Sequence, residues 1–98
     1  METKIKHDQD SVVMQVTGRI DSSSIDVLSS AVSQIPSDSK RVVFDFSQLE
    51  YISSAGLRVL LAAHKIVSKN GQMKLTNVNS TIMEIFDVTG FSDILTIE

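Results

Sequence analysis

The chain has 98 residues, a hydrophobic fraction of 42% and no cysteine, which indicates one small folded domain without disulfides or thiolate metal sites. Its net charge of −3 argues against broad nucleic-acid binding, because such binding needs a concentrated basic surface. No apolar run approaches the roughly 20 residues of a membrane span, and the polar N-terminus argues against a signal peptide. We therefore expect one cytoplasmic domain over residues 1–98 that does not associate with membranes or nucleic acid.

The N-terminal part of the sequence predicts two strands. A short edge strand is expected over Lys4–His7, and a second strand over Ser11–Ile20, where apolar residues recur at strand period. Gly18 interrupts the second strand, which is typical of a bulge. The short segment Asp8–Asp10 allows the two strands to pair as a hairpin.

A first helix follows the segment Asp21–Ser24. Apolar residues recur there every three or four positions and form one stripe. Ser23, with Asp26 three residues later, resembles a capping box. Pro36 is expected to end this helix, because proline disfavours the α conformation in the residue before it.

The middle of the sequence predicts a central strand and a long helix. Arg41–Phe46 is a nearly continuous apolar run, which is typical of a strand covered on both faces. Ser54–Lys69 carries the strongest helical pattern in the chain. We expect Asn70 and Gly71 to stop this helix with a left-handed turn.

The remaining sequence predicts a strand, a short helix and a last strand. Gln72–Val78 alternates between apolar and polar residues, Ser80 is expected to cap a helix that stops near Gly90, and Asp93–Ile97 is expected to form the last strand. The element order is then β-β-α-β-α-β-α-β. Strands that alternate with helices indicate right-handed crossovers and a parallel sheet, which the N-terminal hairpin turns into a mixed one.

Two adjacent hydroxyls, those of Ser53 and Ser54, stand where the long helix begins. A helix start has unpaired N–H groups and the positive end of the helix dipole, so a serine there can cap the helix, act as a nucleophile or carry a phosphate. The nucleophile needs a base within reach. The two histidines are His7 and His64; we expect both at the surface, and His64 lies too far along the helix.

Several neighbouring residues each have two interpretations. Asp21 either caps the first helix or contributes to a surface for a partner or kinase. Gly56 allows either close backbone packing or close approach of a partner. Arg58 either belongs to a solvated helix face or contacts a partner or a phosphate. Asp21 and Asp45 lack a third ligand, so we expect no metal site and no cofactor.

Three segments of the sequence resemble one known family. They are Thr17–Asp21, with a Gly-x-hydrophobic-Asp turn, Asp45–Leu57, which ends in Ser-x-Gly-Leu, and Phe86–Phe91, with a Phe-Asp-x-Thr-Gly element. Their order and spacing are similar to those of the STAS domain, specifically the bacterial anti-sigma factor antagonist (anti-anti-sigma factor) family. The resemblance implies an α/β STAS fold over the whole chain. The final helix of many members has no counterpart here before Glu98.

The resemblance implies a binding switch without catalytic activity. In this family the unmodified antagonist, as a monomer, binds an anti-sigma factor and so releases a sigma factor. The anti-sigma factor is typically a GHKL-type serine kinase that phosphorylates the antagonist, and a PP2C-type phosphatase reverses the reaction. Ser54 matches the phosphorylated serine. Ser53 stands where the family often has aspartate, so it is a possible alternative acceptor, and Ala55 stands where serine or threonine is common.

The sequence thus predicts a partner-binding surface around the phosphorylation site, made of Asp21, Ser22, Ser53, Ser54, Ala55, Gly56 and Arg58. Two other functions remain as alternatives. One is a STAS scaffold that docks other signalling proteins without being phosphorylated. The other, which ranks last, is a small serine-dependent hydrolase.

Overall fold

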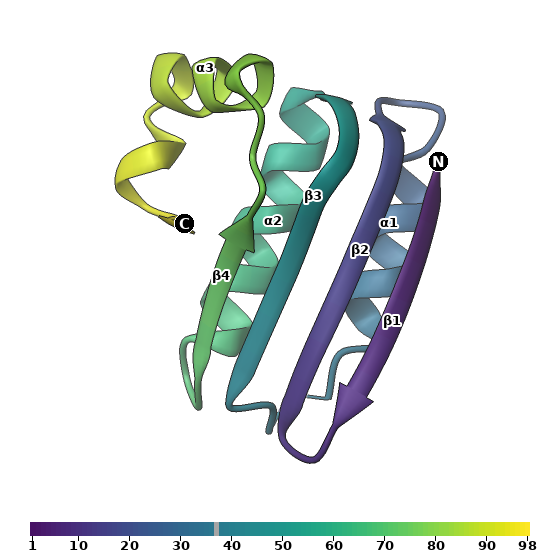
Figure 1. The fold of residues 1–98 in the computed structure, drawn as a ribbon, viewed down its shortest axis with the longest axis vertical. Helices are drawn as coiled ribbons and strands as arrows, with labels where there is room; N and C mark the ends of the chain where they lie inside the picture. Colours follow the sequence, from purple (N-terminus) through teal and green to yellow (C-terminus); the bar gives the residue numbers. More distant parts are fainter. Residues whose placement is uncertain (37) are drawn as a thin grey trace.

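The computed structural model describes residues 1–36 and 38–98, which form a five-stranded sheet with helices packed on one face and across one end (Figure 1). The elements are β1 (Glu2–Asp8), β2 (Ser11–Ile20), α1 (Ile25–Ser33), β3 (Arg41–Ile52), α2 (Ser54–Val67), β4 (Gln72–Thr76), α3 (Ser80–Thr89), a 3-10 helix η1 (Phe91–Asp93) and β5 (Thr96–Ile97). The predicted order of strands and α-helices is confirmed.

The sheet has the strand order β1-β2-β3-β4-β5. β1 runs antiparallel to β2, and the other neighbouring strands are parallel, so the predicted mixed sheet is confirmed. β1 is longer than the predicted Lys4–His7, because its pairing extends from Glu2 opposite Thr17 to Asp8 opposite Ser11. In the hairpin turn Gln9 adopts a left-handed conformation, with φ of 56°.

One face of the sheet carries the core. The side chains of Val12, Met14 and Val16 on β2, Val42, Phe44 and Phe46 on β3, and Met73 and Leu75 on β4 are buried, and α1 and α2 cover this face (Figure 1). On the opposite face Val43 and Asp45 remain half-exposed. The expectation that the central strand is covered on both faces is therefore wrong. Its continuous apolar run arises because Val43 adds a β-branched residue to the open face.

β3 is much longer than the predicted Arg41–Phe46. Its register against β2 shifts twice, between the partners of Gln15 and Thr17 and again between those of Gly18 and Arg19. At each shift β3 contains one extra residue, as in a β-bulge. The buried positions of β3 therefore change from alternate residues to Leu49 and Ile52. Pairing with β2 continues to Ile52, immediately before α2.

Several predicted helix ends are wrong. α1 has Ser24 as its N-cap residue and no side-chain cap, so the Ser23–Asp26 capping box does not form. α3 is capped by Asn79 rather than Ser80. Gly71 does not adopt a positive φ; a side chain there would collide with the carbonyl oxygens of Ser39 and Lys40. The predicted stop near Gly90 is confirmed, with φ of 82°.

The C-terminal segment differs most from the sequence prediction. The expected strand Asp93–Ile97 begins as the end of the 3-10 helix η1, and only Thr96 and Ile97 pair with β4. α3 lies beyond the end of β4 and beside the end of β3 (Figure 1). Asn79 attaches the start of α3 to β3, because its Nδ2 donates to the Leu49 carbonyl at 2.8 Å. The start of α2 therefore lies at the end of the sheet that also carries α3 and the β2–α1 turn.

Candidate functional site

Ser53 is the residue that joins β3 to α2. Its N–H donates to the Ile20 carbonyl at 2.8 Å, so strand-like pairing with β2 continues to the residue before the helix. Its side-chain oxygen accepts from the Gly56 N–H at 3.3 Å, and its carbonyl accepts from Leu57 N–H at 3.0 Å. Ser53 is therefore the N-cap of α2, a position that favours serine.

Ser54 is the first residue of α2 and is exposed. Within residues 1–36 and 38–98 its hydroxyl makes no hydrogen bond, because Ser53 already provides the cap. The N–H groups of the first helical residues have no partner within the helix, and the dipole there favours an anion. The Ser54 hydroxyl is thus free at a position that accommodates negative charge.

Gly56 lets the first turn of α2 approach the sheet. A Cβ at this position would lie 2.6 Å from Cγ2 of Ile20 and 2.7 Å from Cγ1 of Ile52. Real side chains do not pack this closely, so a larger residue would move the helix or the strands. Of the two interpretations of Gly56, the structure shows close backbone packing. Leu57 beside it is also buried and anchors the same turn.

The β2–α1 turn beside this junction is held by its own side chains. Asp21 Oδ1 accepts from the Ser23 N–H at 3.0 Å and from the Ser23 hydroxyl at 2.6 Å. The Ser24 hydroxyl donates to the Arg19 carbonyl at 2.8 Å and accepts from the Asp21 N–H at 3.0 Å. The Ser23 hydroxyl, followed by the Ser23 N–H, lowers the pKa of the Asp21 carboxyl below its ordinary value. Asp21 therefore stabilises the turn and is not the cap of α1.

The predicted surface residues come from two segments that the structure brings together. The hydrogen bond from Ser53 to Ile20 places the turn of Asp21 and Ser22 beside the start of α2. Ser22 and Ser54 are exposed, whereas Ala55 is half-buried and Gly56 is buried. Gly56 can therefore shape the site but offers a partner little surface.

Of the two arginines in this region, Arg58 belongs to the predicted surface, whereas the contact of Arg19 is not predicted from the sequence. The Arg58 side chain is exposed one helical turn after Ser54, and it makes no ion pair within the part of the chain that the structure describes. Arg19 stacks on the Tyr51 ring, with its guanidinium carbon 4.7 Å from the ring centroid. The pair forms because the second bulge brings Arg19 opposite Tyr51. An alignment of β2 and β3 without bulges does not pair them.

The described residues do not assemble a catalytic serine. His64 lies ten residues after Ser54 on the same helix, about 15 Å along its axis at ~1.5 Å per residue. It is half-buried, contrary to the expected surface position, and its Nδ1 is buried without a hydrogen-bond partner in the described chain. His7 is exposed on β1, as expected.

Asp45 is engaged within the fold. Its Oδ1 accepts from Asn77 Nδ2 at 3.0 Å and from the Ser47 N–H at 2.9 Å. The Asn77 amide, followed by the Ser47 N–H, lowers the pKa of Asp45. Across the described ranges, no three His, Cys, Asp or Glu side chains cluster as metal ligands. None of the helices in these ranges is long and apolar enough to cross a membrane.

Comparisons with known proteins agree with this architecture. The family model of the STAS domain matches residues 2–98. BtrV of Bordetella bronchiseptica, which is assigned as an anti-sigma factor antagonist, is 40% identical over 62 residues, covering 62% of this chain and 53% of that protein. The anti-sigma-B factor antagonist of Bacillus subtilis is 28% identical over 94 residues, covering 95% of this chain and 86% of that one.

A solved structure extends the comparison to the fold. The structure of the Bacillus cell fate determinant SpoIIAA in the phosphorylated form superimposes with a TM-score of 0.73 at 16% sequence identity. The match covers 99% of this chain and 91% of that one. The chain thus has the same fold over almost all of its described length, although it spans only about half the length of BtrV.

Proposed function

Because the chain belongs to the STAS domain family, we propose that it acts as an anti-sigma factor antagonist that is switched by phosphorylation of Ser54. In the unphosphorylated form it binds an anti-sigma factor, a GHKL-type serine kinase, and so releases a sigma factor. Phosphorylation by that kinase ends the binding, and a PP2C-type phosphatase restores it. The names of the two matching proteins from Bordetella and Bacillus support the role of anti-sigma factor antagonist.

One observation carries the assignment of Ser54. Ser53 caps α2 with its hydroxyl, whereas Ser54, the next residue, is exposed and has a free hydroxyl. A kinase needs an accessible hydroxyl that is not already committed to capping the helix. Ser54 meets both conditions, and Ser53 meets neither fully. This division of roles also explains how serine can replace the aspartate that the family often has before the acceptor, because both residues are good N-caps.

The phosphorylated form is expected to keep the fold. A phosphate on Ser54 adds about −1.5 to −2 charges beside the N-terminus of α2, where the dipole favours an anion by about 0.3–1 kcal/mol. Arg58 stands four residues later, at a spacing that allows an ion pair with the phosphate. The effect of the modification therefore falls on the partner, which would have to desolvate a dianion in the interface.

The surface that meets the partner is proposed to combine the turn of Asp21 and Ser22 with Ser53, Ser54, Ala55 and Arg58. Gly56 supports this surface from beneath, since it lets the first turn of α2 rest on Ile20 and Ile52. We propose that the protein binds as a monomer, with all these residues contributed by one copy.

The test uses the anti-sigma kinases encoded in the same genome. Each is purified and incubated with the protein and labelled ATP, and the acceptor is located by mass spectrometry. We expect label on wild type and on Ser53→Ala, and none on Ser54→Ala. A label that persists on Ser54→Ala would show that Ser54 is not the acceptor. Binding without any label on wild type would support the unphosphorylated scaffold instead.

The switch itself is tested by calorimetric titration of the same kinase. Ser54→Asp is expected to weaken binding by about tenfold or more, because it places a charge in the interface. Its melting temperature is expected to stay close to that of wild type, since the helix start tolerates an anion. Ser30→Asp adds the same charge at an exposed serine on α1, outside the proposed surface, and is the matched control. Unchanged binding of Ser54→Asp, or a large loss of stability, would contradict the switch.

A further inference from the structure

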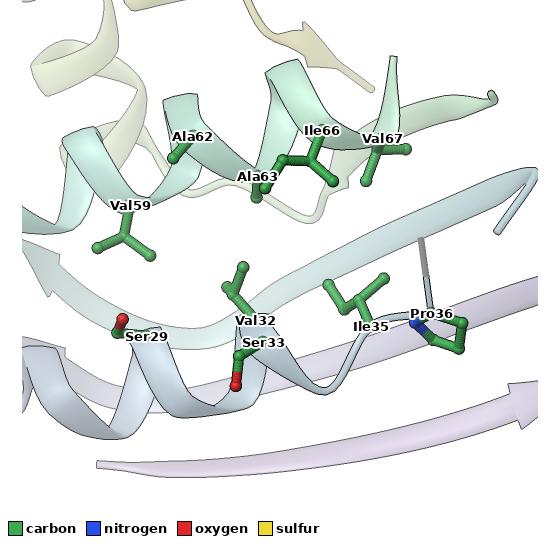
Figure 2. A pocket seen from close by; sticks show the side chains of 10 residues that line it. All are labelled: Ser29, Val32, Ser33, Ile35, Pro36, Val59, Ala62, Ala63, Ile66 and Val67. Carbon is green, nitrogen blue, oxygen red and sulfur yellow. The ribbon is translucent and has the colours of Figure 1, made fainter. Parts of the chain in front are cut away.

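A hollow of about 420 Å³ lies between α1 and α2 on the outer surface of the helical layer (Figure 2). It is lined by Ser29, Val32, Ser33, Ile35 and Pro36 on one side and by Val59, Ala62, Ala63, Ile66 and Val67 on the other. We call it the α1–α2 groove. Figure 2 shows Val32 and Ile35 pointing toward Val59, Ala63 and Ile66. The groove exists because the facing positions carry alanines on α2 and serines on α1, which are too short to fill the gap.

The groove leaves apolar surface in contact with water. Ala63 and Val67 form a buried floor, Val59 is half-buried, and Ile66 is 51% exposed. Ala62 at the rim is also exposed. Hollows of this size that are lined mainly by apolar side chains are common binding sites.

A stripe of positive charge borders the groove along α2. Arg58 and Lys65 are exposed on α2, where helical spacing places them on one stripe with Ser54. This stripe lies directly beside that of Val59, Ala62 and Ile66, and the exposed Lys69 follows in the turn after α2. α2 contains no acidic residue. This is unusual in a chain with a net charge of −3. We call Arg58, Lys65 and Lys69 the cationic stripe.

The acidic residues on or near α1, which forms the other wall of the groove, do not neutralise this positive charge because they do not line the groove. Asp26, near the start of α1, lines a separate hollow on the opposite side of that helix, together with Val27 and Gln34. Asp38 lies beyond the end of α1. The groove therefore combines an apolar floor with a cationic rim on α2, and its occupant should carry the complementary pattern.

We propose that the α1–α2 groove receives an amphipathic helix of the anti-sigma factor, with an apolar ridge in the groove and carboxylates along the cationic stripe. Helices that dock into grooves present apolar residues at i, i+3, i+4 and i+7, which suits a channel between two helices. A second copy of this chain is a poor occupant, because its own cationic stripe would face the same charge. The proposal rests on the proposed function for the identity of the partner.

The groove also gives the switch a physical mechanism. A phosphate on Ser54 joins the cationic stripe, where it repels the carboxylates of the docked helix. It also pairs with Arg58 and withdraws that cation from the partner. One modification then both lowers the positive charge of the rim and changes its pairing, and neither effect requires movement of the backbone.

The first experiment measures binding of the anti-sigma kinase to groove variants. Ile66→Glu is expected to weaken binding by about tenfold or more, and Lys65→Glu to weaken it similarly. The matched controls are Val27→Glu, an aliphatic residue that is 43% exposed on the far side of α1, and Lys6→Glu, an exposed lysine on β1. Both controls are expected to bind like wild type. Melting curves check that all four variants, which change exposed side chains, remain folded.

The outcomes separate the groove from the switch. If the kinase binds wild type and responds to Ser54 phosphorylation, but Ile66→Glu and Lys65→Glu bind like their controls, the groove proposal is overturned and the proposed function stands. If no anti-sigma kinase binds wild type, the proposed function fails and a second probe decides about the groove.

That probe is a pair of stapled synthetic helices with leucines at i, i+3, i+4 and i+7 and either glutamates or lysines on the flanks. Chemical-shift changes at Val59, Ala62 and Ile66 that saturate with the acidic helix, and are weaker with the basic one, support the groove. Absence of these changes, or equal binding of the two helices, overturns the proposal.

Discussion

α1 and α2 both begin with consecutive serines, yet their first turns differ in what those serines do. At α1 the Ser24 hydroxyl bonds to the Arg19 carbonyl and the Asp21 N–H, and the helix has no side-chain cap. At α2 the Ser53 hydroxyl caps the helix through the Gly56 N–H, and Ser54 is exposed. The serine next to α1 is thus engaged in the preceding turn, whereas Ser54 at the start of α2 is free because Ser53 caps the helix.

The third helical residue shows the same contrast in packing. In α1 this residue is Val27, whose side chain is 43% exposed. In α2 it is Gly56, which lies within contact distance of Ile20 and Ile52. The first turn of α2 is therefore held against the sheet, whereas Val27 of α1 faces solvent. A rigid helix start is a suitable place for a switch, because added charge there alters the surface rather than the fold.

The largest expected effect is on Gly56. Gly56→Ala should destabilise the protein by about 1–3 kcal/mol, because the new Cβ forces the helix away from Ile20 and Ile52. Val27→Ala is the matched change at the start of α1 and should alter the free energy of unfolding by less than about 0.5 kcal/mol. Urea unfolding followed by circular dichroism measures both. Equal stability of the two variants would show that the two helix starts do not differ in packing.

The sequence predicts the order of the elements well, because strand and helix periodicity depend on local patterns. The junction at Ser53 and Ser54 is predicted for the same reason, since a polar pair separates an apolar strand from a helical stripe. The predicted ends of helices and strands are wrong where contacts with distant segments of the chain determine them. Position 71 needs a glycine because a side chain there would collide with the carbonyl oxygens of Ser39 and Lys40. From the sequence alone, Asn70 followed by Gly71 looks like an ordinary left-handed helix stop, which the structure does not contain.

Two further differences between the sequence prediction and the structure have the same cause. β3 continues through Ser47 and Gln48, which look like a loop, because bulges keep its backbone paired with β2. The capping box fails because the Ser23 hydroxyl bonds to Asp21 instead of the helix. Around the candidate site, the sequence predicts which residues contribute but not which of Ser53 and Ser54 caps the helix, since either serine can do so.

The next effect concerns Ser24. Ser24→Ala removes a hydroxyl that bridges Arg19 and Asp21 in a buried position, and we expect a loss of about 1–2 kcal/mol. Ser22→Ala in the same turn changes an exposed side chain and should have little effect. Thermal unfolding of both variants tests the difference. If Ser24→Ala were as stable as wild type, the Ser24 hydroxyl would not hold the turn.

A smaller effect separates Ser53 from Ser54. Ser53→Ala removes the cap of α2 and should cost about 1 kcal/mol. Ser54→Ala, one residue later, should change the free energy of unfolding by less than about 0.5 kcal/mol, since its hydroxyl is exposed and uncommitted. Urea titrations of the two variants give the comparison directly. A greater loss for Ser54→Ala would mean that Ser54 is the cap and Ser53 the free hydroxyl.

The smallest expected effect is the pH dependence of the stability that the β2–α1 turn contributes to the protein. Since the Ser23 hydroxyl lowers the pKa of Asp21, the ionised carboxylate stabilises the folded state. This contribution is complete above the ordinary aspartate pKa of about 4 and is lost as the pH falls through the lower pKa of the folded protein. Ser23→Ala should therefore be less stable than wild type near neutral pH.

The difference between wild type and Ser23→Ala should shrink as the pH falls from about 4 through the lower pKa of Asp21 in folded wild type, because Asp21 is protonated in both proteins below that pKa. Ser22→Ala, whose hydroxyl makes no hydrogen bond to Asp21 in the described chain, should follow wild type at every pH. Urea unfolding at several pH values measures the three curves. A constant difference between wild type and Ser23→Ala would show that the Ser23 hydroxyl acts independently of the Asp21 charge. In that case the turn beside α2 would be stabilised by neutral hydrogen bonds alone. The stability of the starts of α1 and α2 would then not differ in its dependence on pH.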